Sequence, residues 1–166
     1  MKTLLLTRHG KTIQGDGQMT DFDRYLTTRG YKDPGLVFKE LEDSGIIPGK
    51  IITSPAIRAV QTARIFADKF QIPESNITLA DFIYGYFSTS KLIELLQNTA
   101  SKYPCVQVVG HNPKMEELAA DLTGSVYRRL PTSATMVLEF DVKKWEYISE
   151  GSGTLLHYIS PKSLKE

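Results

Sequence analysis

The sequence predicts an α/β fold, in which a mainly parallel central sheet is flanked by helices and gains antiparallel strands toward the C-terminus. Over most of the 166 residues, short apolar runs alternate with segments of helical periodicity. This alternation is typical of parallel sheets with helices on their faces. The last part of the chain contains strand-like segments joined by short polar turns, which is typical of antiparallel pairing.

The composition sets limits on the class of protein. The formal net charge is +1, and no basic run is interleaved with aromatic residues, so nucleic acid and anionic membranes are not expected as partners. The length suits a single domain over residues 1–166. We expect a soluble, cytoplasmic protein, because we find neither a signal peptide nor an apolar stretch near the roughly 18 residues that span a membrane. The single cysteine, Cys105, is expected to be a buried thiol.

The first predicted strand lies in Leu4–Gly10, an apolar run that stops abruptly at Arg8, His9 and Gly10. Gly10 leaves the backbone free to turn and would let a ligand approach closely. The polar segment Lys11–Tyr25 has the composition of a loop.

Three helix starts are predicted from capping residues. Thr27 is expected to cap a helix that Pro34 breaks or kinks before it ends near Gly45. Ser54-Pro55 is expected to provide the N-cap and first residue of a helix with a regular apolar stripe, and Asn112-Pro113 to do the same for another.

The remaining elements follow from short apolar runs and turn residues. A further helix is expected after Ser88 or Thr89, with Leu92, Leu95 and Leu96 facing inward. Further strands are predicted at residues 50–53, 76–79, 105–109, 134–140, 145–149 and 155–159.

Three chemically active side chains follow three predicted strands. His9 closes the first strand, Arg58 lies in the first helical turn after the second, and His111 follows the strand at 105–109. The carboxyl ends of parallel strands meet at one edge of a sheet, where helix N-termini favour anions. Arg8 and Arg58 can also give forked hydrogen bonds to phosphoryl oxygens. The pattern therefore predicts a site for a tetrahedral dianion.

The same arrangement favours nucleophilic catalysis by His9. Positive neighbours disfavour the imidazolium, so the pKa of His9 should be lowered and one ring nitrogen should stay free to attack phosphorus. Hydrolysis would then proceed by phosphoryl transfer to His9, followed by release to water. If the arginines stabilise the equatorial oxygens, neither a metal nor a cofactor is needed, and we find no cluster with metal-ligand spacing.

The sequence resembles the histidine phosphatase (phosphoglycerate mutase-like) superfamily, and in particular its short SixA-type phosphohistidine phosphatases. Four blocks carry the resemblance in order along the chain: Arg8–Gly10, Leu26–Gly30, Thr53–Ala63 and Val109–Pro113. Three further blocks are shared with the SixA type: Leu130–Thr132, Leu138–Asp141 and Gly151–Gly153.

The resemblance implies a three-layer phosphoglycerate mutase-like fold and a role for each matching residue. His9 would be the phosphorylated nucleophile, and Arg8, Arg58 and His111 would complete the phosphate pocket. Arg24 matches an Arg-Pro-Leu-Thr block of this branch as a substrate-binding arginine, although Tyr25 replaces the proline. Together with Gly10, Arg24 is our candidate for substrate binding.

One expected residue is missing. Many family members protonate the leaving oxygen of a phosphate ester with a carboxylic acid after the third strand, but residues 79–91 contain only Asp81, and Tyr86 stands where related sequences often have Glu. General acid catalysis typically contributes ~10²–10⁴ in rate. The missing acid favours labile phosphoryl donors, such as phosphohistidine in a signalling protein. A histidine phosphotransfer domain is an example of such a protein. The alternatives are a phosphomonoesterase acting on a small metabolite and a catalytically silent phosphoprotein-binding module.

Overall fold

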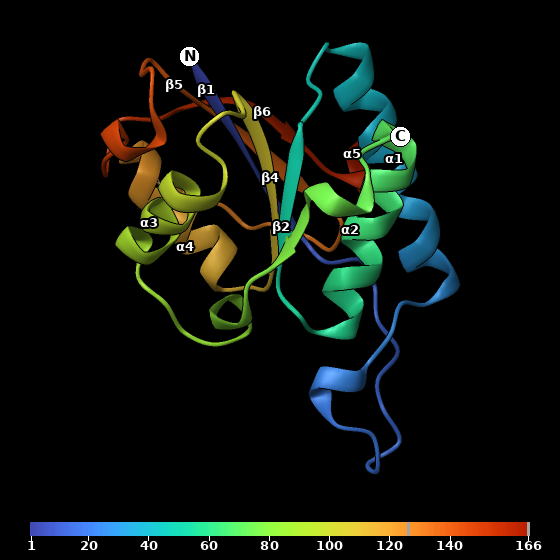
Figure 1. Cartoon of the computed structure of the whole chain (residues 1–166). Coiled ribbons are helices and arrows are strands. Elements are labelled where there is room, and N and C mark those ends of the chain that lie inside the picture. Colours follow the sequence, from blue (N-terminus) through green and yellow to red (C-terminus); the bar gives the residue numbers. More distant parts are fainter. Residues whose placement is uncertain (126, 166) are drawn as a thin grey trace.

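The computed structural model describes residues 1–125 and 127–165 and has three layers, with helices on both faces of a central sheet (Figure 1). Six strands form the sheet in the order β3-β2-β4-β1-β5-β6. Their bounds are β1 (Lys2–Arg8), β2 (Lys50–Thr53), β3 (Ile77–Leu79), β4 (Cys105–Gly110), β5 (Thr135–Phe140) and β6 (Thr154–Ile159).

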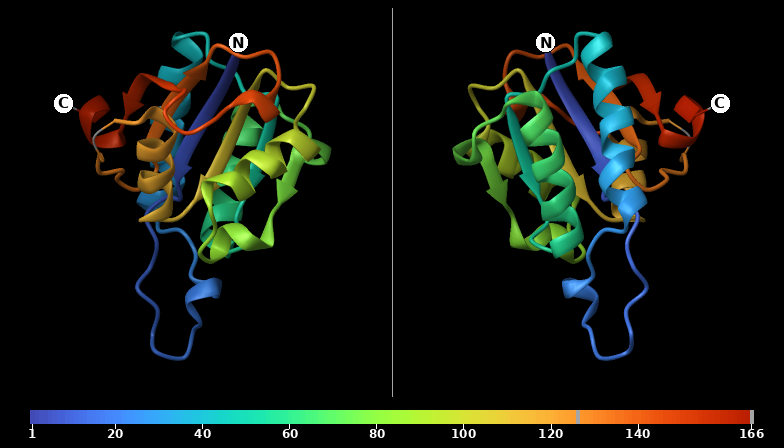
Figure 2. Two further views of the ribbon diagram at one scale, coloured as in Figure 1. Left: turned by 90° about the vertical axis from the view of Figure 1, so that its left-hand side faces the viewer. Right: turned by 90° about the vertical axis from the view of Figure 1, so that its right-hand side faces the viewer.

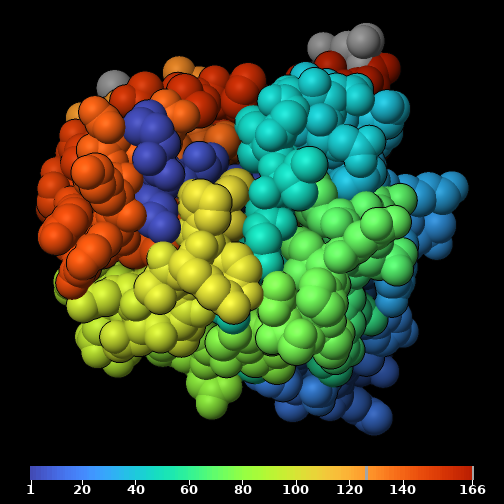
Figure 3. Space-filling model, turned by 45° about the horizontal axis from the view of Figure 1, so that its top comes forward, coloured from blue at the N-terminus to red at the C-terminus, as the bar shows by residue number. Residues whose placement is uncertain are grey.

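The pairing of the strands confirms the predicted mainly parallel sheet. β1, β2, β3 and β4 are parallel, whereas β5 pairs antiparallel with β1 and β6 pairs antiparallel with β5. At the end where the chain starts, the first residues (dark blue) lie between β4 (yellow) and the C-terminal segments (orange; Figure 3). β4 therefore lies between β1 and β2, which brings the ends of these three strands together.

The helices divide between the two faces of the sheet (Figures 1 and 2). One face carries α1 (Thr28–Asp43), α2 (Ile57–Phe70) and α5 (Pro161–Lys165), and the other carries α3 (Thr89–Thr99) and α4 (Lys114–Thr123). Short 3₁₀ turns connect these elements: η1 (Asp21–Asp23), η2 (Glu74–Asn76), η3 (Asp81–Tyr84) and η4 (Trp145–Tyr147). Within the described residues, no helix combines the length and the apolar composition that a membrane span needs.

The apolar run of β1 reflects burial on both sides of the sheet. Leu4 and Leu6 belong to the core under α3 and α4, whereas Leu5 belongs to the core under α1 and α2. All three side chains are fully buried. Burial of a leucine stabilises the fold by roughly 1.5–3 kcal/mol, so this strand is firmly fixed within the sheet.

A predicted helix break and a predicted strand were wrong because tertiary packing dominates at these positions. A break or a kink is predicted at Pro34, but α1 runs without a break through this residue, which is buried along the same helix as Val37 and Leu41. The predicted strand at 145–149 is instead the 3₁₀ turn η4. The indole ring of Trp145, the first residue of this turn, is buried. Its N–H donates to the carbonyl oxygen of Ala100, so the side chain anchors the turn against α3.

Two helices begin later than their capping signals predicted. Thr27 caps α1 as expected, since its hydroxyl accepts from the Gly30 N–H at 3.1 Å. However, α2 begins at Ile57, after Ser54-Pro55, and α4 begins at Lys114 with Pro113 as its N-cap. The side chains of Ser54 and Asn112 have other partners, which the candidate site explains.

Candidate active site

The ends of β1, β2 and β4 lie level with one another. In the sheet register, Arg8 is opposite Gly110 and Thr53 is opposite Val109. The backbone pairing continues one residue further, because the His9 N–H donates to the Gly110 carbonyl oxygen at 3.1 Å. This register places the residues that follow the three strands at one edge of the sheet, as the sequence predicted.

His9 and His111 face each other at this edge, with ring centroids 5.2 Å apart. His9 is 8% exposed. Its Nδ1 lies 2.8 Å from the carbonyl oxygen of Gly10. A carbonyl oxygen can only accept a hydrogen bond, so Nδ1 carries the ring proton and the lone pair of His9 is on Nε2.

His111 is oriented by a serine that the sequence assigned to helix capping. Its Nε2 lies 2.8 Å from Oγ of Ser54, and this hydroxyl also accepts from the N–H of Ala56. The other ring nitrogen, Nδ1 of His111, is buried and has no partner within the described residues. Ser54 therefore fixes the ring and leaves Nδ1 as the atom available to a bound group.

Both histidines are held in the neutral form. Burial lowers the pKa of His9 to about 3; the hydrogen bond to Gly10 opposes this shift, and repulsion from protonated His111 and from the charges of Arg58 and Arg8 adds to it. Burial and the charge of Arg58 lower the pKa of His111 to about 4. Neutral imidazole is the nucleophilic form of histidine, so His9 is ready to react at neutral pH.

The two arginines approach the site from different sides. Arg58 comes from the first turn of α2 and is 6% exposed. Both of its Nη atoms donate to Asp21, one to the backbone carbonyl oxygen at 2.6 Å and one to Oδ2 at 3.0 Å. Arg8 ends β1 and donates from Nη1 to the Leu130 carbonyl oxygen at 3.4 Å, while its Nε is buried and unpaired within the described residues.

The two residues predicted to bind substrate are engaged within the protein. Arg24 donates to the Ile13 carbonyl oxygen at 2.9 Å and to Asp21 Oδ1 at 3.0 Å. The N–H of Gly10 donates to the hydroxyl of Thr62 at 2.9 Å, and a Cβ on Gly10 would lie 2.7 Å from the Gly30 carbonyl oxygen. Packing against the start of α1 therefore accounts for this glycine. Contact of Arg24 or Gly10 with substrate stays a prediction.

The segment after β3 holds the candidates for a proton donor. Asp81 is exposed at the start of η3, and Tyr86 is 89% exposed. The side chain that reaches the site from this segment is Tyr84, whose ring lies edge-on to His111 with centroids 5.7 Å apart. Its hydroxyl donates to Asp21 Oδ2 at 2.8 Å. Sequence reasoning left Asp21 and the hydrogen-bonding role of Tyr84 out of the site.

The loop Lys11–Tyr25 extends beyond the body of the molecule at the end of the sheet where β1 stops (Figure 2). Its base is closed by a bridge between Thr12 and Leu26. The Leu26 N–H also donates to the side chain of Gln61 on α2 at 2.9 Å. Beyond its base, the loop meets the site through the residues of η1.

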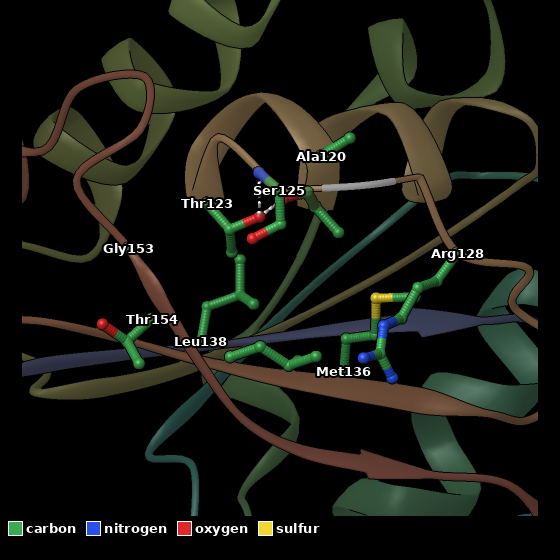
Figure 4. Close-up of a pocket in the computed structure, with 10 residues that line it drawn as sticks. Ala120, Thr123, Ser125, Arg128, Met136, Leu138, Gly153 and Thr154 are labelled. Atoms are coloured by element: carbon green, nitrogen blue, oxygen red, sulfur yellow. Dashed lines mark hydrogen bonds between the residues drawn. The ribbon is translucent and has the colours of Figure 1, made fainter.

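Two cavities lie near α4. One, of about 400 Å³, adjoins the site and is lined by Arg8, Asn112, Glu116, Tyr127, Arg129, Leu130 and Pro131. The other, of about 520 Å³, lies between α4 and the strands β5 and β6; Figure 4 shows it with Arg128 and Met136 at one end and Thr154 at the other. The residues that line this second cavity include neither histidine nor arginine of the candidate site. Within residues 1–125 and 127–165, no three side chains of His, Cys, Asp or Glu gather as a metal site.

Comparisons with known proteins agree with this geometry. The family described as "Histidine phosphatase superfamily (branch 1)" matches residues 4–103. An uncharacterised chloroplastic protein of Arabidopsis thaliana is 29% identical over 157 residues, which cover 87% of this chain and 69% of the relative. The protein histidine phosphatase SixA, solved in complex with tungstate, superposes with a TM-score of 0.83 at 26% identity, covering 98% of this chain and 99% of the other. A phosphoserine phosphatase from Entamoeba histolytica shares the fold, with a TM-score of 0.67, 16% identity and 98% coverage of both chains.

Proposed function

The chain belongs to the histidine phosphatase superfamily, and from this premise we propose that it removes the phosphoryl group of protein phosphohistidine through a covalent intermediate on His9. The observation that carries the proposal is a pair of neutral histidines whose ring centroids are 5.2 Å apart, with no partner for Nε2 of His9 among the described residues. Arg8 and Arg58 belong to the same site, because their charges contribute to the lowered pKa of both rings. This combination supplies a nucleophile together with positive charge for a phosphoryl group.

In the first step, Nε2 of His9 attacks phosphorus and forms a P–N bond. The bond between phosphorus and the substrate imidazole breaks, and the leaving nitrogen takes a proton from water. Arg8, Arg58 and Nδ1 of His111 stabilise the charge on the equatorial oxygens. His111 donates from Nδ1 when Ser54 donates its own proton to Nε2.

In the second step, water attacks phosphorus on the side opposite His9. The P–Nε2 bond breaks, inorganic phosphate leaves, and the proton lost by the attacking water passes to the phosphate or to solvent. His9 returns to its neutral form, with the proton still on Nδ1, because the hydrogen bond to Gly10 holds this tautomer throughout.

The positions of the candidate proton donors support phosphohistidine as the substrate. Asp81 is exposed, and the hydroxyl of Tyr84 is directed to Asp21, so neither is placed to protonate a leaving alkoxide. A phosphoramidate has a better leaving group and needs this help less. We also propose that the reaction is metal-independent, since the two arginines provide the positive charge that a metal would otherwise supply. The partner would then be a phosphorylated protein, such as a histidine phosphotransfer domain.

A second candidate function is the hydrolysis of a small phosphate ester. The cavity of about 400 Å³ beside Arg8 supports it, because its size suits a small metabolite. This cavity contains the carboxylate of Glu116, but the Tyr127 hydroxyl and the Leu130 N–H both donate to that carboxylate at 2.7 Å. These two donors engage the carboxylate within the protein, so Glu116 is not directed at a leaving group.

Steady-state kinetics on a panel of phosphorylated compounds tests the proposal. We expect kcat/KM for a phosphohistidine protein to exceed that for an alkyl phosphate by at least about 10²-fold, the factor that a missing general acid would account for. The rate should be unchanged in EDTA. A preference for the alkyl ester would favour the second candidate. Binding of the phosphoprotein without turnover would favour a silent phosphoprotein-binding module.

A further inference from the structure

We infer that Asp21 is a positioning residue for this reaction, because it holds the guanidinium of Arg58 in place for the phosphoryl group. The inference rests on the proposed function. It adds to the proposed site a residue that does not lie at the end of a strand. Asp21 lies in η1, inside the loop Lys11–Tyr25, and no catalytic side chain is expected in this loop from the sheet register alone.

The contacts of Arg58 carry the inference. Within the described residues, every hydrogen bond of its side chain goes to Asp21: Nη1 donates to the backbone carbonyl oxygen and Nη2 donates to Oδ2. Nε is buried and has no partner in the described part of the chain. An arginine side chain loses rotamer entropy when it is ordered, so an unanchored guanidinium would reach the productive orientation only part of the time.

Asp21 is itself held from two directions. Arg24, in the same loop, donates to Oδ1 at 3.0 Å, and Tyr84 of η3 donates to Oδ2 at 2.8 Å. The rings of Phe22 and Tyr84 also meet edge to face, with centroids 5.2 Å apart. The carboxylate thus connects the loop, the start of α2 and the turn after β3, three segments that are far apart in the sequence.

Asp21 keeps its negative charge at and around neutral pH. Burial would raise its pKa, but the hydrogen bonds from Tyr84, Arg58 and Arg24 and the charge of Arg58 lower it to about 2. The carboxylate therefore stays ionised and keeps both charge-assisted bonds near neutral pH. The two hydrogen bonds also leave the remaining Nη protons of Arg58 for a phosphoryl oxygen.

A double-mutant cycle tests whether Asp21 acts through Arg58. We expect Asp21→Ala to lower kcat/KM about tenfold or more in the natural background, because a charged hydrogen-bonding partner is lost. In an Arg58→Ala background the same change should cost less than about twofold. Tyr84→Phe removes only a hydroxyl and should lower kcat/KM by about threefold to tenfold, an effect that disappears when Asp21 is already absent.

Asp23→Ala is a matched control, since Asp23 lies in the same 3₁₀ turn and, among the residues that the structure describes, its side chain bonds only the exposed Thr20 hydroxyl. It should leave kcat/KM within about twofold. Asp21→Asn serves as the second variant if Asp21→Ala folds poorly, because it keeps the shape of the side chain and removes the charge. Equal losses in both backgrounds would mean that Asp21 merely supports the loop. A gain in activity would show that its carboxylate competes with the phosphoryl group, and either result overturns the inference.

Tungstate binding measured by calorimetry separates this inference from the proposed function, since it requires no turnover. We expect the same non-additive pattern in tungstate affinity. Asp21→Ala should weaken tungstate binding in the natural background and should weaken it little further in the Arg58→Ala background. Non-additive tungstate binding in an enzyme that does not hydrolyse phosphohistidine would contradict the proposed substrate alone. Additive losses in tungstate affinity would contradict the positioning role alone.

Discussion

The candidate site joins two regions that the fold fixes in different ways. The ends of β1, β2 and β4 are fixed by the sheet register and by strands buried on both faces. The loop Lys11–Tyr25 extends outside this body and reaches the site through Asp21. The proposed nucleophile, His9, is therefore positioned by the core of the protein, whereas we infer that the orientation of Arg58 depends on a surface loop. Changes at the strand ends should affect both stability and chemistry, and changes in the loop should affect chemistry first.

The largest effect is expected from His9→Ala, which removes the only group proposed to form the covalent intermediate. We expect kcat to fall by at least about 10³-fold, as is typical when a nucleophile is deleted. Because the side chain packs among neutral and cationic groups at a strand end, the variant should remain folded. Circular dichroism is the control for folding, and residual activity above a tenth of the natural rate would contradict the assigned role.

A second test disturbs the contact between the first turn of α1 and the start of the loop. A Cβ on Gly30 would lie 2.2 Å from the carbonyl oxygen of Lys11, a backbone atom that cannot move without shifting the start of the loop. Gly30→Ala should lower the free energy of unfolding by about 1–3 kcal/mol, the usual cost of overpacking. Urea denaturation measures this cost.

The matched control for that test is Gly85→Ala. A Cβ at Gly85 would meet no atom of the described residues within 4 Å, and the φ of Gly85 is −101°. The free energy of unfolding should therefore change by less than about 0.5 kcal/mol. Equal costs at Gly30 and Gly85 would show that the close approach at Gly30 does not constrain the fold.

The buried histidines make stability depend on pH. Their folded pKa values, about 3 for His9 and about 4 for His111, lie below the ordinary value of 6.5. Below pH 6.5 the unfolded chain therefore binds protons that the folded protein does not, and stability falls as the pH falls. Between about pH 7.5 and pH 5 the free energy of unfolding should drop by about 2 kcal/mol for each histidine.

His9→Asn tests the share of that dependence that belongs to one ring. Urea denaturation of the variant should show about half of the drop seen in the natural protein. Asp21 does not contribute in this range, because its pKa of about 2 keeps it ionised at both pH values. An unchanged slope in His9→Asn would mean that His9 is not held neutral in the folded state.

The last test of this comparison is Ser54→Ala, which removes the hydroxyl that orients His111. We expect kcat to fall about tenfold, equivalent to the loss of one hydrogen bond of about 1–1.5 kcal/mol. Ser90→Ala, at an exposed position on α3, is the control and should leave kcat unchanged. An equal kcat in both variants would show that Ser54 caps the backbone alone.

The comparison of the two regions also explains what could be predicted from the sequence. The strand ends were predictable because apolar runs mark buried strands, and parallel strands bring His9, Arg58 and His111 to one edge. The outcomes at Ser54 and Pro34 were not predictable, because partners distant in the sequence decide whether a serine caps a helix or a proline breaks one. Asp21 was missed for the same reason: its three donors come from the loop, from α2 and from η3, and no local pattern connects them.

The central claim is that the phosphoryl group passes through Nε2 of His9, and chemical trapping of this intermediate tests it most directly. The protein would be mixed with a phosphohistidine protein carrying a labelled phosphoryl group, quenched in alkali within the first turnover and digested for peptide mapping. We predict an acid-labile, alkali-stable label on the peptide that contains His9, and no label in His9→Ala. Turnover without any labelled His9, or a label on another residue, would contradict the account.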